Sequence, residues 1–189
     1  MSISTTQSEP GTAKRESDRT PPLTVSRPEL LIDGSDRDFR ALVHGMLAFA
    51  ARLEAVRSGF AGIIGLTGIQ YTILISVGHL ERAGNVSVSM IAAHLHLSGA
   101  FVTIETGKLL RLGLLTKRPD RKDRRRVRLS ITRKGGDLLH RLAPVQAQVN
   151  DVLFEFLDAG QFRQFRGLVA RMTACGDRAV ALLECLESQ

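Results

Sequence analysis

The feature of this sequence that most constrains its fold is a series of helix start and stop signals. Thr67, Ser87 and Ser98 each precede an apolar stretch with helical spacing, where a hydroxyl can accept a hydrogen bond from a free amide of the first turn. Gly113 can adopt the left-handed conformation that often ends a helix. The pattern predicts helices over 68–80, from Ser87 to Leu95 and from Ser98 to about Leu112. The last two, separated by a tight turn, form a helix-turn-helix.

A strongly basic hairpin is predicted to follow. LLTKRP and RRVRLSIT are rich in apolar and β-branched residues, and PDRKDR between them offers turn-forming Pro and Asp. Between Lys117 and Lys134 stand ten basic residues and two acidic ones, more excess charge than the +7 of the whole chain. A hairpin directly after a helix-turn-helix is a wing, and this one favours a polyanionic partner.

Longer amphipathic helices are predicted on both sides of this region. Ser35 is a plausible cap for a helix over about 36–57, which the loop SGFAGIIG ends. A heptad-like apolar seam runs from Leu138 to Phe156, with a kink expected at Pro144, and a last apolar helix follows 158–160. The two C-terminal helices carry more apolar surface than a small winged helix covers, so a partner chain is expected, most simply a second copy.

We therefore predict a mainly α (α+β) fold, a winged helix-turn-helix with a two-stranded wing and long N- and C-terminal dimerisation helices. The expected organisation is a flexible N-terminal arm (1–34) that could gain order at Leu30–Ile32, a helix and loop for dimerisation (35–66), a DNA-binding winged helix (67–135) and C-terminal dimerisation helices (136–189). Neither a membrane-spanning run nor a signal peptide is recognisable, and the chain has two cysteines. A cytoplasmic protein without a membrane partner is expected.

Two stretches, LTGIQYTILISV and the run from VSVSMIAAHL to LSITRKG, resemble the core of the MarR (multiple antibiotic resistance regulator) family. The most specific part is the wing pattern Asp120-x-x-Asp123-x-Arg125, followed by a strand and Ile131-Thr132-x-x-Gly135. The resemblance covers about residues 36–186. It implies a homodimeric transcription regulator that binds double-stranded DNA, with Arg125 in the minor groove and Asp123 holding the shape of the wing. It also implies repression at a pseudo-palindromic operator, relieved by a small aromatic or anionic effector.

The expected DNA contacts lie on the wing and on the second helix of the helix-turn-helix, from Ser98 to about Leu112, which is the recognition helix. The family usually has polar or basic residues where Gly99, Phe101 and Ile104 stand, so base readout stays open here. Phe101 has two roles open to it, contact with a thymine methyl group or burial in the core. The expected DNA-binding residues are Ser98, Gly99, Ala100, Phe101, Thr103, Thr106, Lys108, Arg118, Lys122, Arg124, Arg125 and Arg126, with Asp120 and Asp123 structuring the wing.

The resemblance places an effector site where the first, second and fifth helices meet the DNA-binding lobe. Arg40, His44, Arg52 and Tyr71 are the polar or cationic groups expected there. An arginine can hold a carboxylate through two hydrogen bonds, so an aromatic acid or a derivative is the expected effector. A surface or structural role remains an equal alternative for each of the four.

The sequence gives less support to other functional classes than to a transcription regulator. Because His94 and His96 point to different faces of a helix, no metal or other cofactor is expected. Cys175 and Cys185 are expected to be buried thiols, with oxidant sensing as the alternative. No catalytic motif is recognisable, so an enzyme is not expected, even one that uses a winged helix for dimerisation. The main alternative is a non-specific architectural DNA-binding protein, which a competition assay against random duplex would distinguish.

Overall fold

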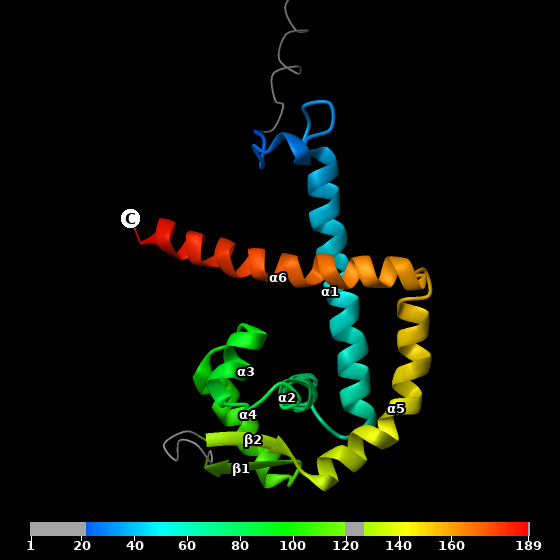
Figure 1. Ribbon diagram of the computed structural model, residues 1–189, viewed down its shortest axis with the longest axis vertical. Coiled ribbons are helices and arrows are strands. Elements are labelled where there is room, and N and C mark those ends of the chain that lie inside the picture. The colour runs from blue at the N-terminus through cyan, green and yellow to red at the C-terminus, as the bar shows by residue number, and fades with distance from the viewer. Residues whose placement is uncertain (1–21, 120–126, 189) are drawn as a thin grey trace, which may run out of the picture. The chain divides into compact units, whose positions relative to one another are not determined.

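A computed structural model describes residues 22–119 and 127–188 of this chain (Figure 1). The chain divides into two compact units between Leu53 and Glu54. The elements are a 3₁₀ helix (Pro28–Leu30), α1 (Arg37–Ile63), α2 (Gly68–Leu80), α3 (Val88–Leu95), α4 (Gly99–Arg111), β1 (Leu115–Pro119), β2 (Val127–Ile131), α5 (Arg133–Leu153) and α6 (Ala159–Glu187). Among the described residues no single helix is long and apolar enough to cross a membrane, although two bent helix pairs reach that length and composition when each is taken together.

In the first unit, the segment before α1 is tied to the start of that helix. Asp36 is buried, and its carboxylate accepts hydrogen bonds from the amide and hydroxyl of Thr24, both at 2.7 Å, and from Arg40 Nε at 3.0 Å. Arg40 also donates to the carbonyl of Pro22. Residues 22–34, which the sequence assigns to a flexible arm that could gain order at Leu30–Ile32, are thus tied to α1 through Pro22 and Thr24. Residues 1–21 lie outside the described part of the chain.

Helix α1 extends six residues beyond its predicted end at residue 57. Its last turns pass into the second unit, where Phe60 and Ala61 are buried, and this burial outweighs the low helix propensity of the neighbouring glycines. The helix ends in a Schellman motif: Leu66 N donates to the carbonyl of Ala61, and Gly65 takes a positive φ of 71°.

The winged-helix core of the second unit is built on the predicted caps. The hydroxyls of Thr67, Ser87 and Ser98 each accept a hydrogen bond from the amide three residues later, at 3.2–3.3 Å. Helix α2 is the central element, with most of its residues from Gln70 to Val77 buried. Figure 1 shows α2, α3, α4 and the β-hairpin gathered in one lobe, in green. The predicted fold class is confirmed for this lobe.

The wing is an antiparallel hairpin in which Leu115 pairs with Ile131 and Arg118 with Arg128. Leu115 of β1 and Leu129 of β2 are buried and lie on the same face of the hairpin. Leu129 also donates its amide to the carbonyl of Val86 at 2.8 Å, which ties the hairpin to the segment before α3.

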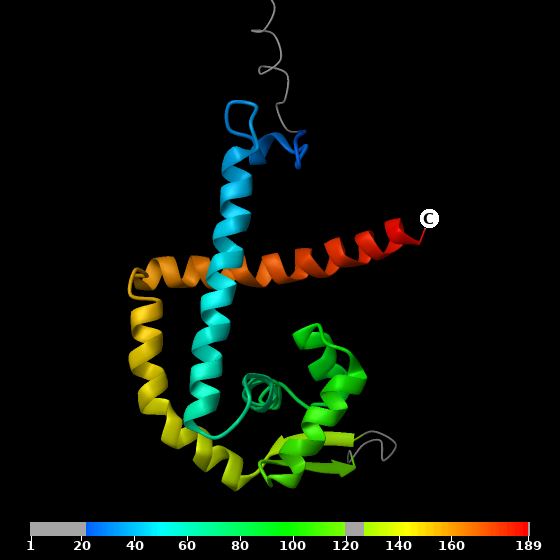
Figure 2. The ribbon, with the colours of Figure 1, turned by 180° about the vertical axis from the view of Figure 1, so that it is seen from behind.

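Helices α5 and α6 complete the second unit. Helix α5 contains Pro144, and its axis bends along its length (Figure 2). Leu142 is buried, whereas Val152 is 68% exposed, so the predicted α5 seam contributes only in part to the core of this chain. Asp158 caps α6, in which no described residue is buried. Its apolar side chains therefore face outward from the chain.

Candidate nucleic-acid interface

Helix α4 has two chemically different faces. Val102, Glu105, Thr106 and Leu109, spaced three or four residues apart, are buried against the core. The opposite face presents the exposed residues Gly99, Ala100, Phe101, Thr103 and Ile104, and then Lys108 and Arg111 toward the C-terminal end. The exposed face is the part of α4 that is able to enter a groove of DNA.

Thr106 does not lie on that face. Its side chain is 2% exposed, and its Oγ1 has no hydrogen-bond partner among the described residues. The expectation that Thr106 contacts DNA is therefore wrong in this structure, because its position in the helical repeat coincides with the buried stripe. Phe101, by contrast, is 40% exposed, which excludes full burial in the core.

The buried carboxylate of Glu105 connects α4 to α2. It accepts hydrogen bonds from Lys108 Nζ at 2.6 Å and from Gln70 Nε2 at 3.2 Å. Gln70 in turn completes the capping box of Thr67 at the start of α2. The ammonium of Lys108 lowers the pKa of Glu105, against the opposing effect of burial. Sequence reasoning missed this residue, since a glutamate within a recognition helix gives no signal of burial.

The hydroxyl groups at the start of α4 are engaged within the helix. Ser98 Oγ accepts from the amide of Phe101, and Thr103 Oγ1 donates to the carbonyl of Gly99 at 2.7 Å. Each hydroxyl retains part of its hydrogen-bonding capacity. The first two turns of α4 nevertheless present few polar groups to a partner.

The wing presents cations on its outer face. Arg118 and Arg128 lie directly opposite each other in the hairpin and are both exposed, on the face opposite to the buried Leu129. Like charges in this position destabilise a hairpin. Within residues 22–119 and 127–188, neither arginine has an acidic partner. An anionic ligand would offset this repulsion.

The remaining predicted wing residues lie outside the described part of the chain. They are Asp120, Lys122, Asp123, Arg124, Arg125 and Arg126. Their assigned roles stay predictions.

The four predicted effector residues fall in both units. In the first unit, Arg40 is bound to Asp36, Arg52 donates to the carbonyl of Ala48 at 2.8 Å, and His44 is exposed. In the second unit, Tyr71 is 2% exposed, and its hydroxyl accepts from Gln146 Nε2 at 2.7 Å. Burial raises the pKa of Tyr71. A site shared by residues of the two units stays a prediction.

A third arginine, Arg57, was not predicted from the sequence as a site residue. It donates to Thr72 Oγ1 and lies 3.3 Å from Glu54, and its electrostatic effect opposes the rise in the pKa of Tyr71. Its Nε is buried without a hydrogen-bond partner among the described residues. The rings of Phe60 and Tyr71 pack edge to face, with 6.1 Å between their centroids. A cation and aromatic rings thus converge in the second unit near the end of α1, with α5 contributing Gln146.

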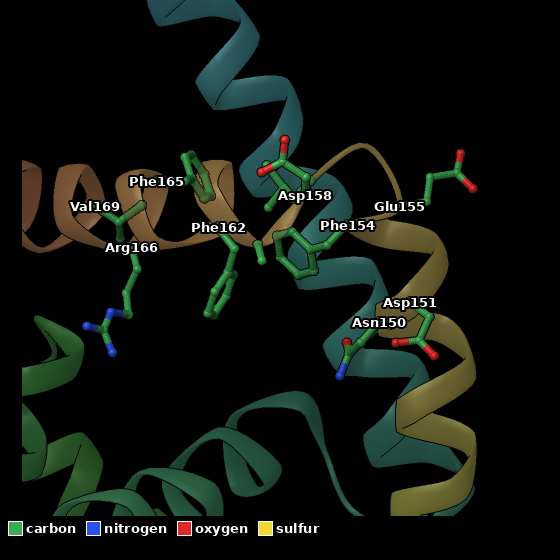
Figure 3. Close-up of a pocket in the computed structure, with 11 residues that line it drawn as sticks. Asn150, Asp151, Phe154, Glu155, Asp158, Phe162, Phe165, Arg166 and Val169 are labelled. Carbon is green, nitrogen blue, oxygen red and sulfur yellow. The ribbon is translucent and has the colours of Figure 1, made fainter.

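A cavity of about 640 Å³ opens at the elbow between α5 and α6 (Figure 3). Apolar residues, among them Phe154, Phe162 and Phe165, line it together with Arg166. Farther along α6, Cys175 and Cys185 are exposed, so the expectation of buried thiols is wrong for the single chain. Within the described residues no cluster of three or more metal-ligating side chains occurs.

The chain is similar to known proteins in part of its sequence. Residues 64–126 match the sequence model of the MarR family. The uncharacterized HTH-type transcriptional regulator YhbI of Bacillus subtilis (strain 168) is 28% identical over 108 residues, which cover 57% of this chain and 68% of that protein.

Solved structures agree in fold. A MarR transcriptional regulator from Methanosarcina mazei Go1 has a TM-score of 0.59 at 17% identity, covering 74% of this chain and 98% of that one. The S. aureus MepR–DNA complex has a TM-score of 0.54 at 17% identity, covering 79% and 99%. Mutant MarR from E. coli complexed with operator DNA has a TM-score of 0.57 at 15% identity, covering 71% and 95%. At sequence identities of 15–17%, these structural similarities establish the fold alone.

Proposed function

We propose that this chain is a winged-helix transcription regulator of the MarR family that acts as a homodimeric repressor, and that a small aromatic or anionic effector relieves its operator binding. In each protomer α4 enters a major groove, and the wing reaches the adjoining minor groove. Two-fold symmetry makes the operator pseudo-palindromic, with half-sites about 10 bp apart.

The observation that carries this proposal is the pairing of Arg118 with Arg128 on the outer face of the wing. Two exposed arginines at directly opposite positions of a hairpin repel each other, and an anionic partner would offset this repulsion. Lys108 and Arg111 add cations at the C-terminal end of the adjacent α4. Together they form a positive surface of the kind that neutralises DNA phosphates.

The proposed dimer rests on the apolar surface of α5 and α6. Phe162, Phe165, Val169 and Met172 follow helical spacing along α6 and are 36–55% exposed in the single chain. Aromatic and aliphatic side chains repeated over several turns are typical of helices that pack against a partner. A second copy of this chain is the partner that two-fold DNA recognition requires.

The proposed effector site is the cluster around Arg57 and Tyr71 in the second unit. A carboxylate can accept a hydrogen bond from the buried Nε of Arg57, while its aromatic ring packs near Phe60 and Tyr71. Because α2 connects this cluster to α4 through Gln70 and Glu105, ligand binding is able to alter the position of the recognition helix. Arg40, His44 and Arg52 of the first unit remain further candidates.

Selection of bound fragments from the source genome tests the DNA-binding proposal. A specific regulator should enrich pseudo-palindromic sites and bind them at least about 10³-fold more tightly than random duplex. Equal affinity for both would favour the architectural alternative. Replacing Arg118 and Arg128 together by alanine should weaken binding, whereas the same loss of charge at Arg171 and Arg178 on α6 should have little effect.

Effector release is tested on the selected site with a panel of aromatic carboxylates. A ligand of the proposed site should raise the melting temperature of the wild-type protein and lower its affinity for the operator. Arg57→Met should abolish both effects while operator affinity without ligand is retained. Ligand effects that persist in Arg57→Met would place the effector site elsewhere.

A further inference from the structure

Two large apolar side chains stand exposed on the recognition helix. Phe101 is 40% and Ile104 is 59% exposed, and their spacing of three residues places them on the same face of α4. Ala100 beside them is also exposed. Removing surface of this size from water would stabilise a complex, so the face is suited to an apolar contact.

The polar groups around this apolar pair are already engaged in part by other groups of the protein. The hydroxyls of Ser98 and Thr103 bond to the backbone of their own helix, and the carboxylate of Glu105 is buried against Lys108 and Gln70. The exposed part of Gly99–Arg111 therefore carries no acidic side chain. Its first two turns offer hydrocarbon where a recognition helix ordinarily offers hydrogen-bonding groups.

The charges that flank the pair indicate what it contacts. Lys108 and Arg111 follow it on α4, and Lys117, Arg118 and Arg128 are exposed on the neighbouring wing. An apolar centre bordered by cations is complementary to a polyanion that carries apolar groups between its phosphates. In the major groove of DNA, the C5 methyl group of thymine is the apolar group on a base edge.

We propose that Phe101 and Ile104 read thymine methyl groups in the major groove, so that the half-site of this protein is selected by methyl contacts. This inference rests on the proposed operator binding and specifies its chemistry. It predicts thymines at the positions facing the start of α4. Burial of one methyl group corresponds to about fourfold in affinity, and two half-sites with one or two contacts each give about tenfold or more.

Replacing thymine by uracil tests the inference, because uracil lacks only the methyl group. Duplexes selected by the protein from a random pool are copied with either dTTP or dUTP, and the affinity for each copy is measured. The wild type should bind the thymine copy about tenfold or more tightly. In Phe101→Ala/Ile104→Ala, affinity for the thymine copy should fall toward that for the uracil copy, so the discrimination is lost. Arg111→Ala is the control, since a lost phosphate contact weakens both copies equally.

The outcomes separate this inference from the function on which it rests. A selection that enriches no sequence would contradict specific operator binding itself. Enriched duplexes bound equally well with thymine and uracil, or discrimination that survives in the double variant, would overturn the methyl contacts alone. The double variant should remain folded with the oligomeric state of the wild type, because Ile104 is mostly exposed and Phe101 is only partly covered. A changed oligomeric state would assign this face to a protein interface and overturn the proposal.

Discussion

At the scale of single residues, Glu105 shows how a buried charge can organise a DNA-binding surface. Its carboxylate holds Lys108 on the same helix and Gln70 on α2. A buried carboxylate is costly unless it is paired, and here an ammonium group and an amide satisfy it. Glu105 thus fixes the position of α4 and orients a cation next to the exposed face.

Glu105→Gln should lower the free energy of unfolding by about 1 kcal/mol near neutral pH, because a charge-assisted hydrogen bond is lost while Lys108 remains partly solvated. The pKa of Glu105 is lowered in the folded state, so its stabilisation is present above the ordinary value of 4.5. That stabilisation is lost as the pH falls through the lowered pKa. Urea unfolding of the wild type and of Glu105→Gln should therefore show a difference in the free energy of unfolding that becomes smaller below about pH 4.

The control for this prediction is Glu54→Gln. Glu54 also pairs with a cation, Arg57, but its side chain is 57% exposed, so its replacement should change the stability less. A difference between wild type and Glu105→Gln that stayed constant down to pH ~3 would show that packing, and not charge, accounts for the effect.

At the scale of elements, the junction between the wing and α5 depends on a close backbone approach. Gly135 is buried in the first turn of α5, where its amide donates to Thr132 Oγ1 at 3.1 Å. A Cβ atom at this position would collide with the carbonyl oxygen of Leu114 and lie 3.0 Å from Ile131 Cγ2. Gly136, the next residue, has open space around it.

Gly135→Ala and Gly136→Ala should therefore change stability in opposite directions. The first forces the backbone at Leu114 to move and should destabilise the protein by about 1–3 kcal/mol. The second replaces an exposed helical glycine and should stabilise it by about 0.5–1 kcal/mol. Thermal unfolding of the two variants measures both effects. Equal shifts of the same sign would contradict this packing of α5 on the wing.

The elements that the sequence predicts well are those determined by local chemistry. The caps at Thr67, Ser87 and Ser98 need only a hydroxyl and the amide three residues later, so the bounds of α2–α4 follow from short motifs. The extra turns of α1 depend on burial of Phe60 by distant residues, and the ties of residues 22–36 depend on Asp36. No local pattern reports such contacts.

The candidate site was predictable to the same extent. The cations on α4 and the wing are visible as charge in the sequence, so their place on the surface could be anticipated. Thr106 and Glu105 were not, because a polar residue on the buried stripe of a helix looks the same in sequence as one on the exposed stripe. Packing against the core determines which residues of α4 are buried, and the apolar pattern of the sequence alone does not identify them.

At the scale of the whole molecule, assembly depends on the apolar stripe of α6. Met172→Asp places a charge within that stripe and should yield monomers or unfolded chain, because an unpaired buried charge costs several kcal/mol. Ala174→Asp adds the same charge to the same helix, about 200° away around its axis, and should remain dimeric. Analytical ultracentrifugation distinguishes the two results. A stable dimer of Met172→Asp would exclude the stripe as the interface.

The salt dependence of DNA binding reports on the whole dimer. If six to ten phosphates are neutralised, log K should fall with log salt at a slope of about −5 to −9. Replacing Arg118 and Arg128 by alanine removes four cations per dimer and should flatten this slope by about 3–4 if each contacts a phosphate. Fluorescence anisotropy at a series of salt concentrations measures the slope.

The control for the slope is the double variant Arg171→Ala/Arg178→Ala, which removes the same charge from the exposed surface of α6. General attraction between the basic protein and DNA depends on net charge, so it would flatten the slope equally in both double variants. Counterion release requires contact with phosphates, so the proposed wing contacts flatten it only when Arg118 and Arg128 are lost. An equal effect of the two double variants, or a wild-type slope flatter than about −2, would contradict the placement of DNA on the wing.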